Sequence, residues 1–355
     1  MTRNNPIQHN TIPENSHQSR NARRSLYIVS GIIGALCLIC VVAAWSVLPH
    51  RKSPHQLLTF SRVRGHDAGQ MYTVSYMGVD GQGRIYIGDW DDGRVSVFDA
   101  SGKDLRVVNL PDGTELLGMA VAQDGTLYFS YDGSIHRMNP DGSQSTISYV
   151  NSKGSTLANI SGIGLGPDGT LAAGDNFGDV LTIPSSKAPQ VVLAKAFDLP
   201  SFSSRNELEP GGGAPVGSYD VPANSADKNV SVAVDASGNI YMLGWISAEV
   251  IKTDPQGGSL SKFGSFSDFP GGWQRGRFDF PTAIVVDSAG RIYVSDSSGV
   301  QVFSADEKYL YSIHLPDGVQ AMTLDSQDNL YVVTEPYDHQ LGGLVYKVIK
   351  FAALK

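Results

Sequence analysis

One phrase, which the chain repeats six times after residue 70, constrains the fold more than any other feature. Each copy joins a short apolar stretch, a tight polar turn and a second apolar stretch. The second stretch carries a tyrosine at the same place in five copies, and the third copy has Ala172 there. The copies occupy residues 79–86, 121–128, 165–172, 234–241, 286–293 and 324–331. Repeats spaced by about 40 residues are typical of propeller blades, so we expect six blades.

The residues around each turn alternate as a β-strand requires. Large apolar side chains alternate with mostly small ones before the turn, as in Gly118–Val121 and Ala283–Val286. Small residues suit an innermost strand, because such strands converge on a narrow axis. A third strand follows in each copy and a fourth in five copies, with Gln190–Leu193 as the fourth strand of the third copy. The sixth copy lacks one, and we expect Leu57–Val63 to fill that place and close the ring.

The fifth copy carries a resemblance to a known family. Residues Phe278–Asp296 and Val300–Phe303 resemble the phrase of the NHL-repeat propellers, with Phe and Pro before an apolar strand, an acidic turn, an Ile-Tyr-Val strand and a Gln-Val-Phe strand. The first and fourth copies match well, and the others are degenerate. The resemblance implies an all-β, six-bladed, NHL-like propeller over residues 55–355. It implies little about activity, because the family includes protein- and RNA-binding scaffolds, extracellular sensor domains and some enzymes.

The stretch before the repeats has the properties of a membrane segment. Residues 26–48 contain no charged side chain and are long enough to cross a hydrocarbon core of ~30 Å as one transmembrane helix. Three arginines in residues 20–24 precede it, so the positive-inside rule places the N-terminus in the cytoplasm and the propeller outside. We therefore expect a disordered cytoplasmic tail over 1–25, a signal anchor over 26–48, a linker over 49–54 and a single-pass protein of the cell membrane. A cleaved signal peptide is the open alternative.

Charge and cysteine content exclude several classes of protein. Cys37 and Cys40 are the two cysteines and both lie in the apolar segment, so the propeller has neither disulfides nor thiol chemistry. Residues 1–48 hold four arginines and one acid, and the remainder is therefore more acidic than the net charge of −8 for the whole chain. Because nucleic-acid binding needs a basic patch, we expect no nucleic-acid partner.

The residues just after the second strand of each copy are the candidate ligand-binding positions. They lie three and four residues beyond the repeated tyrosine, and we expect them to ring one face of the propeller. Acids and tryptophans there would suit a polar or sugar-like ligand. The candidates are Asp89, Trp90, Tyr131, Asp175, Asn176, Trp245, Asp296 and Glu335. The alternative is that the aspartates accept backbone N–H groups within the turns, whereas exposed indoles are harder to explain in that way.

The sequence assembles neither a catalytic group nor a metal site. Residues Asp89–Gly93 resemble a fragment of a calcium loop but lack its later bidentate acid, so a solvated turn is favoured, with calcium as the alternative. Zinc needs three or four converging ligands. His136 falls in a third strand, and His66, His314 and His339 fall in expected loops. We predict no catalytic residue, no metal ligand and no cofactor.

These observations favour a membrane-anchored, extracytoplasmic propeller that is not an enzyme and binds a protein, peptide or glycan on one ring face. The loops after the second strands and the insertion at 197–229 would form that surface. Two alternatives stay open. One is a metal-dependent propeller enzyme of the lyase or lactonase type, and the other is the sensor component of a membrane signalling complex.

Overall fold

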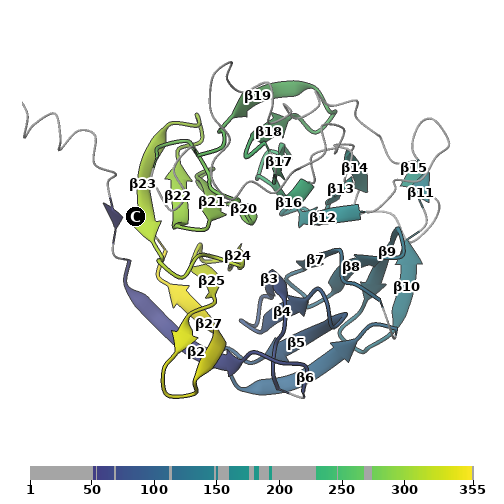
Figure 1. Cartoon of the computed structure of the whole chain (residues 1–355). Coiled ribbons are helices and arrows are strands. Elements are labelled where there is room, and N and C mark those ends of the chain that lie inside the picture. Colours follow the sequence, from purple (N-terminus) through teal and green to yellow (C-terminus); the bar gives the residue numbers. More distant parts are fainter. Residues whose placement is uncertain are drawn as a thin grey trace, which may run out of the picture. The chain divides into compact units, whose positions relative to one another are not determined.

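The computed structural model of the chain describes residues 51–52, 54–67, 69–111, 114–147, 149–150, 160–175, 180–183, 192–193, 229–245, 247–267 and 274–353. The predicted tail, the predicted membrane segment and residues 197–228 of the predicted insertion lie outside these ranges. Within the ranges, no helix has the length and apolar character of a membrane span. Six sheets of three to five strands surround a central axis, and each sheet is one blade of an all-β, six-bladed propeller (Figure 1).

The blades follow the order of the repeats, with the first strand of each nearest the axis (Figure 1). Blade one contains β3 (Val74–Val79), β4 (Ile85–Asp89), β5 (Arg94–Phe98) and β6 (Asp104–Asn109). Blade two contains β7 (Gly118–Val121), β8 (Leu127–Tyr131), β9 (Ser134–Met138) and β10 (Gln144–Ile147). Blade three contains β12 (Ile160–Leu165), β13 (Leu171–Asp175) and β14 (Val180–Ile183).

The second half of the ring follows the same plan. Blade four contains β16 (Asn229–Val234), β17 (Ile240–Gly244), β18 (Val250–Thr253) and β19 (Ser259–Phe263). Blade five contains β20 (Ala283–Val286), β21 (Ile292–Asp296), β22 (Gly299–Phe303) and β23 (Tyr309–His314), with β1 (Arg51–Lys52) added in parallel to β23. Blade six contains β24 (Ala321–Leu324), β25 (Leu330–Thr334), β27 (Gly343–Phe351) and β2 (Gln56–Val63), and β26 (Tyr337–Asp338) pairs with β27.

The ring closes between the two ends of the propeller. Strand β2 runs antiparallel to β27, from Gln56 opposite Phe351 to Val63 opposite Val345. The residues expected to complete the last blade therefore supply its outermost strand. This pairing removes an exposed edge from each partner.

The predicted fourth strand of blade three is wrong in its pairing. Within residues Gln190–Leu193, the structure describes β15 (Val192–Leu193), which pairs in parallel with β11 (Tyr149–Val150) and not with β14. The sequence suggests why, because Pro184 directly follows β14 and Pro189 precedes β15. Proline has no N–H to donate to a ladder, so the hairpin that joins the third and fourth strands of other blades is disfavoured here.

Small residues on the innermost strands allow neighbouring blades to approach closely. A Cβ atom added to Gly78 would come within 2.5 Å of the Val121 side chain in the next blade. A Cβ atom on Gly164 would lie 2.6 Å from the carbonyl oxygen of Val232. The small residues that the sequence places on the innermost strands are therefore needed for the close approach of blades at the narrow axis.

A recurring hydrogen bond explains the repeated tyrosine. In four blades, the tyrosine hydroxyl of the second strand donates to an aspartate that begins the preceding turn, an arrangement that we call the tyrosine clasp. The four clasps join Tyr86 to Asp80 at 3.1 Å, Tyr241 to Asp235 at 3.1 Å, Tyr293 to Asp287 at 3.0 Å and Tyr331 to Asp325 at 3.2 Å. A buried hydroxyl needs a partner, and the aspartate provides it.

Candidate functional site

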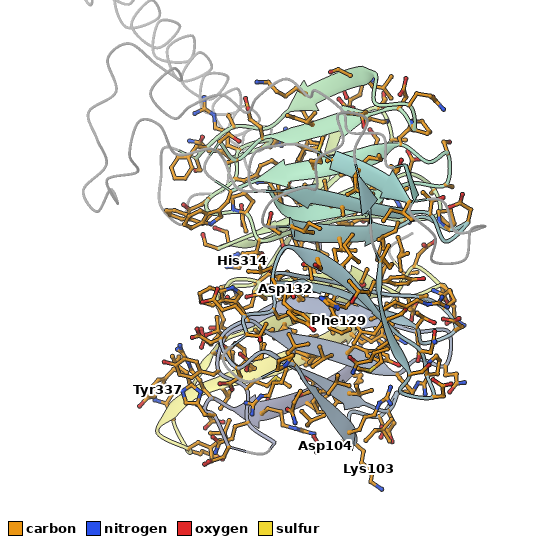
Figure 2. The ribbon with its side chains drawn as sticks, turned by 90° about the vertical axis from the view of Figure 1, so that its right-hand side faces the viewer. Lys103, Asp104, Phe129, Asp132, His314 and Tyr337 are labelled. Atoms are coloured by element: carbon orange, nitrogen blue, oxygen red, sulfur yellow. The ribbon has the colours of Figure 1, made fainter. Side chains whose placement is uncertain are left out.

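The propeller has two chemically different ends. The hairpins between first and second strands and between third and fourth strands, such as 80–84 and 99–103, open at one end. The turns between second and third strands, such as 90–93, and the connections between blades open at the other end, which we call the crossover face. Lys103 and Tyr337 lie on opposite sides of the propeller in Figure 2 and mark the two ends. The predicted site residues that the structure describes belong to the crossover face, because each either ends a second strand or directly follows one.

His66 and Asp92 form the shortest histidine–carboxylate contact among the described residues. His66 lies in the connection from blade six to blade one, and Asp92 lies in the turn between β4 and β5. The distance from His66 Nδ1 to Asp92 Oδ1 is 2.6 Å. The histidine side chain is 63% exposed, whereas that of Asp92 is 15% exposed. The pair therefore presents an accessible imidazole on a largely buried carboxylate.

Arg94, the first residue of β5, holds both halves of this pair. Its Nη2 lies 2.7 Å from Asp92 Oδ2, and its side chain is 11% exposed. The same guanidinium donates to four backbone carbonyls of the segment that carries the histidine, those of Gly65, His66, Asp67 and Gln70, at 3.2, 3.0, 3.5 and 2.8 Å. One cation thus neutralises the carboxylate and fixes the position of the histidine backbone.

The hydrogen bond at Nδ1 decides which nitrogen of His66 can accept a proton. An ionised carboxylate only accepts hydrogen bonds, so a neutral His66 carries its proton on Nδ1 and a lone pair on Nε2. A histidine oriented in this way can take a proton at Nε2, and the carboxylate then stabilises the imidazolium.

Tyr72 connects this pair to blade six. Its ring centroid lies 3.8 Å from that of His66, and the Arg64 guanidinium lies 5.1 Å from the Tyr72 ring. Arg64 Nη1 is 3.0 Å from Glu335 Oε1, so the predicted site residue of blade six reaches the cluster. Tyr346 donates its hydroxyl to the Tyr72 carbonyl at 2.7 Å. Burial, assisted by the charge of Glu335, raises the pKa of Tyr346, so this hydroxyl keeps the proton that it donates.

Asp89 and Trp90 support the same cluster. The Asp89 carboxylate is buried and accepts the backbone N–H groups of Tyr72 and Thr73 at 2.7 and 3.1 Å. The N–H of Trp90 donates to the Thr73 carbonyl at 2.8 Å. Asp89 therefore has the backbone-binding role that was the alternative to ligand binding, and it positions Tyr72 beside His66.

Tyr131 belongs to a separate, closed arrangement in blade two. Its ring stacks on His136 at 3.9 Å and 7°. Both nitrogens of His136 have partners, Asp132 Oδ1 at 3.3 Å and Thr146 Oγ1 at 3.2 Å. The His136 side chain is only 11% exposed, so this histidine packs within its blade and does not face a ligand.

Trp245 and Asp296 lie near the junction of blades four and five. Trp245 follows β17 and is 37% exposed, and its ring lies 5.9 Å from that of Phe280, which is 39% exposed. Asp296 ends β21 and is buried beside Asp279, whose backbone N–H lies 3.4 Å from Asp296 Oδ2. Burial and the negative charge of Asp279 raise the pKa of Asp296 to about 6, against the lowering effect of the N–H groups of Ser298 and Asp279.

The structure therefore divides the predicted ring into separate groups. Asp89, Trp90 and Glu335 gather around Tyr72, and Trp245 and Asp296 flank the junction of blades four and five. Asp175 is the last residue of β13, and Asn176 lies outside the described residues. The sequence reasoning missed His66, Asp92, Arg94, Asp279 and Phe280. The signal for Asp92 was present in the acidic turn 89–93, which we interpreted as a solvated turn, with a calcium loop as the alternative. His314, expected in a loop, is the last residue of β23.

The described residues do not fit a metal ion. Among them, no group of three or more histidine, cysteine or acidic side chains is arranged to hold one. In the turn 89–93 that resembles a calcium-loop fragment, Asp89 accepts backbone N–H groups and Asp92 binds His66 and Arg94. These oxygens are already used by donors, so we derive no step through a metal.

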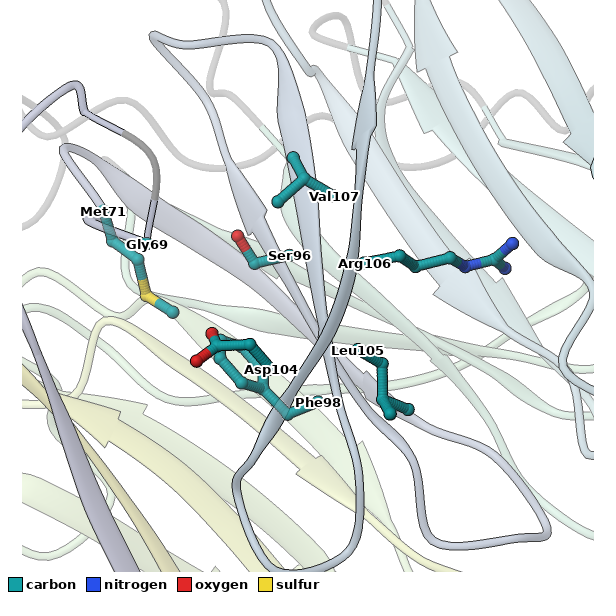
Figure 3. A pocket seen from close by; sticks show the side chains of 8 residues that line it. All are labelled: Gly69, Met71, Ser96, Phe98, Asp104, Leu105, Arg106 and Val107. Atoms are coloured by element: carbon teal, nitrogen blue, oxygen red, sulfur yellow. The ribbon is translucent and has the colours of Figure 1, made fainter.

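A pocket of about 160 Å³ lies away from this face, on the outer side of blade one. Met71, Phe98 and Leu105 form its apolar part and Asp104 and Arg106 belong to its rim (Figure 3). The pocket includes neither His66 nor Asp92, and its open, largely apolar lining offers few groups that could orient a ligand.

Comparisons with known proteins identify the fold. No protein-family model matches the chain, and no curated protein matches it in sequence. Solved structures do match in shape. A virginiamycin B lyase from Staphylococcus aureus is 12% identical with a TM-score of 0.52, and the match covers 82% of this chain and 98% of the lyase.

A second structural relative is XC5397 from Xanthomonas campestris, a gluconolactonase. It is 15% identical with a TM-score of 0.54, and the match covers 85% of this chain and 97% of that protein. A streptogramin B lyase structure is 10% identical with a TM-score of 0.51, covering 84% and 87% of the two chains. At these identities the likeness supports the six-bladed propeller fold. These three propeller neighbours are all enzymes.

Proposed function

We propose that this protein is a propeller enzyme that acts on a small molecule at its crossover face, with His66 as the proton acceptor. The observation that carries the proposal is the arrangement of His66, Asp92 and Arg94. An exposed imidazole is oriented by a carboxylate at 2.6 Å, which is itself held by an arginine at 2.7 Å. The fold supports the same class, because the solved neighbours include lyases and a gluconolactonase.

The reaction class follows from what His66 can do. Nε2 would remove a proton from water, which attacks a lactone carbonyl so that the acyl C–O bond of the ring breaks, or from the carbon adjacent to the one that bears the ester oxygen, so that a C=C bond forms and that C–O bond breaks; the released oxygen leaves as the alcohol in the first case and as the carboxylate in the second. In both cases the proton passes to Nε2 and Asp92 stabilises the resulting charge. Arg64, 35% exposed and held by Glu335, supplies positive charge beside Tyr72 for the oxygen that becomes negative.

Substitutions at the pair test the proposal. A panel of lactones and cyclic esters would be screened with the full chain, and the product mass distinguishes hydrolysis, which adds one water, from elimination, which adds none. We expect His66→Ala to lower kcat by about 10²–10⁴-fold with little change in KM. His314→Ala, on the same face, serves as the control and should keep the activity. Full activity of His66→Ala would overturn the proposal.

Asp92 and Arg94 are positioning residues, and a different readout tests them. Asp92→Asn keeps the shape but no longer stabilises an imidazolium, so kcat should fall and its dependence on pH should move. Arg94→Lys retains the charge but not the set of backbone hydrogen bonds, and should lower kcat less than Arg94→Ala does. Unchanged kcat in both Arg94 variants would contradict the positioning role.

Three features of the sequence extend the proposal. We propose that the blades are of the NHL-like type, that residues 26–48 anchor the protein as a single membrane-spanning segment, and that the propeller lies outside the cytoplasm. A fractionation experiment with the full chain and with a chain lacking residues 26–48 tests the anchor, and digestion of the propeller by a protease added to intact cells tests its location. Release of the protein from membranes only in the shortened chain is the expected result.

The second candidate function is a module that binds a protein, peptide or glycan, acting alone or as a membrane sensor. The exposed ring of Trp245 favours it, because large exposed aromatic side chains often mark contact surfaces. This candidate predicts that Trp245→Ala abolishes binding to an immobilised glycan or peptide panel, whereas His66→Ala does not.

A further inference from the structure

Blade six carries a long hairpin on the crossover face. The turn between its second and third strands spans residues 335–342 and includes β26, whereas the same turn of blade five spans residues 297–298. Figure 2 shows Tyr337 of this hairpin at the end of the propeller opposite Lys103. We call residues 335–344 the blade-six hairpin. Its backbone is closed by its own hydrogen bonds, from the N–H of Val345 to the Pro336 carbonyl at 3.1 Å and from the N–H of Gly342 to the Asp338 carbonyl at 2.8 Å.

The most exposed large side chains of the blade-six hairpin are apolar. Tyr337, Leu341 and Leu344 are 55%, 62% and 37% exposed. Tyr337 stands directly opposite Leu344 in the antiparallel pair of β26 and β27, so these two side chains are neighbours on one side of the hairpin. Exposed apolar side chains that are grouped in this way mark a contact surface more often than single ones do.

The one charged side chain of this segment is engaged with the hairpin itself. Residues 336–346 contain no lysine, arginine or glutamate, and Asp338 is their only aspartate. Asp338 Oδ1 accepts the backbone N–H groups of Gln340 and Leu341 at 2.8 and 3.0 Å. The carboxylate therefore stabilises the turn, and the exposed tip is left without a competing charge.

Arg64 fixes the hairpin beside the His66 cluster. Its backbone N–H donates to the Leu344 carbonyl at 3.2 Å, and its Nη1 lies 3.0 Å from Glu335 Oε1. The same guanidinium lies 5.1 Å from the Tyr72 ring, which stacks on His66. One residue thus contacts both ends of the hairpin and the proposed active site, so the two are held together on one face.

The chain enters the propeller close to this face. Lys52 of β1 is paired with Ile313, and the next residue, His314, is paired with Gly299 at the start of β22, directly after a turn of the crossover face. Residues 49 and 50 alone separate the apolar segment 26–48 from β1. A fully extended chain spans about 11 Å from residue 48 to residue 51. A membrane segment that ends at residue 48 would therefore keep the crossover side of blade five, next to blade six, close to the bilayer.

We propose that the blade-six hairpin docks onto the lipid bilayer that holds residues 26–48, with Tyr337, Leu341 and Leu344 entering its interface. This inference rests on the membrane anchor proposed above. Tyrosine is enriched at membrane interfaces, and apolar side chains of peripheral elements enter the boundary between headgroups and acyl chains. Because Arg64 joins the hairpin to the His66 cluster, docking brings the proposed active site to the lipid surface.

Labelling from within the bilayer tests the contact. The full chain is reconstituted in phosphatidylcholine vesicles that contain a phospholipid with a diazirine in its acyl chain, and mass spectrometry locates the lipid adducts after illumination. We expect adducts on 26–48 and on 335–344. Residues 104–109 are the control, because their Leu105 and Val107 are 51% and 47% exposed but lie on the outer strand of blade one, and they should carry none.

Each other distribution of adducts has a distinct meaning. Adducts on 26–48 without adducts on the hairpin would overturn the docking and leave the anchor in place. Adducts on neither segment would overturn both. Adducts on the hairpin alone would retain the lipid contact and overturn the anchor. Equal labelling of 104–109 would mean contact of any exposed apolar residue with lipid and would contradict a specific docking surface.

A double variant then assigns the contact to the hairpin side chains. Tyr337→Ser with Leu341→Ser changes two exposed residues, so the protein should fold normally. Its hairpin adducts should fall by about tenfold or more, with labelling of 26–48 unchanged. Leu105→Ser with Val107→Ser is the matched control and should leave hairpin labelling unaltered. Unchanged hairpin labelling in the first variant would overturn the assignment.

Two further measurements separate this inference from its alternatives. His66→Ala should give the same adducts as the natural protein, so failure of the proposed enzyme and failure of the docking are distinguishable. A dimer of the full chain in detergent that is lost in the Tyr337→Ser, Leu341→Ser variant would assign the hairpin to a second copy of the chain and would contradict docking onto lipid.

Discussion

Blade five and blade three are built from the same repeat, yet they solve the same packing problem differently. Blade five has four strands of its own and a fifth from β1, whereas the described sheet of blade three has three. Blade five has the clasp between Tyr293 and Asp287, and blade three has Ala172 and Gly166 at these two positions. Blade five thus has both the tyrosine and the aspartate, and blade three has neither. The two residues occur together here because the hydroxyl and the carboxylate are each other's hydrogen-bond partners.

Blade two shows what happens when only one half is present. It keeps Tyr128 but has Ala122 where the clasped blades have aspartate. Tyr128 is only partly buried, whereas the four clasped tyrosines are at most 2% exposed. A tyrosine can therefore be buried completely in this fold where its hydroxyl has a carboxylate partner, and the comparison can be tested blade by blade.

The largest loss of stability is expected when the aspartate of the blade-five clasp, Asp287, is removed. Asp287 accepts the backbone N–H groups of Ala289 and Arg291, the Arg291 side chain at 2.6 Å and the Tyr293 hydroxyl. Asp287→Ala leaves these donors unpaired in a buried site and should lower the free energy of unfolding by about 3–5 kcal/mol. Urea denaturation measures it.

The matched control lies in the turn of blade three. Asp168 accepts the backbone N–H and the hydroxyl of Thr170 on an exposed turn. Asp168→Ala should cost about 1 kcal/mol or less. Equal losses in the two variants would show that the clasp adds nothing to blade five.

The next effect concerns the buried acid of blade five and depends on pH. The folded-state pKa of Asp296 is about 6, above its ordinary value of 3.8, so the folded state binds this proton more tightly than the unfolded state. Stability should therefore fall as the pH rises from 4 to 7, by on the order of 3 kcal/mol. Asp296→Asn removes that contribution, and its stability relative to the natural protein should increase across the same window.

A second acid of the same blade provides the control for this measurement. Hydrogen bonds from Lys308 and Ser304 lower the pKa of the exposed Asp306 to about 2. Asp306→Asn should therefore leave the slope between pH 4 and pH 7 unchanged. If the stability of Asp296→Asn has the same dependence on pH as that of the natural protein, the pKa of Asp296 is not raised in the folded state.

A smaller effect separates the hydroxyl of the clasp from its ring. Tyr293→Phe keeps the buried ring but leaves Asp287 with one donor fewer, and should cost about 1–2 kcal/mol. Tyr128→Phe in blade two removes a hydroxyl that has no acid at position 122, so it should cost less than about 0.5 kcal/mol. Thermal unfolding of both variants checks the difference, and a larger loss for Tyr128→Phe would refute the link between clasp and burial.

The smallest effect is expected in the exchange of backbone amides. Strand β22 pairs on both sides, with β21 and β23, whereas β14 is the edge of its described sheet. Amide protons of Val180–Ile183 should therefore exchange at least tenfold faster, on average, than those of Val300–Phe303. Hydrogen exchange followed by mass spectrometry resolves the two segments. Similar rates would mean that blade three is as firmly paired as blade five.

The fold could be predicted from the sequence because its information is local and repeated. Each blade has its own alternation of apolar and small residues and its own turn, as in Ala283–Val286 and Gly290. The six repeats therefore predict the same blade structure almost independently. The fourth strand of blade three could not be read in this way. Its apolar residues are typical of a strand. Its pairing with β11 instead of β14 depends on contacts between segments that are distant in the sequence.

The candidate site was only partly predictable for a related reason. Asp89 and Asp296 stand at fixed places in the repeat, so their position on the crossover face follows from the spacing. His66 and Arg94 become neighbours through contacts between the connection from blade six and the first blade, a proximity that no period reveals. Phe280 has the residue type of a core position. Its exposure accompanies a positive φ of 49°, a backbone conformation that cannot be predicted from a phenylalanine in the sequence.

The pairing of β2 with β27 has a consequence for biosynthesis. The ribosome delivers β2 first, and nearly the whole propeller must be made before its partner emerges. Until then the early strand has an unsatisfied edge, which a chaperone could shield and which a neighbouring nascent chain could capture. A chain that stops before Gly343 would leave the ring open, so translation errors late in the message should yield molecules that cells degrade.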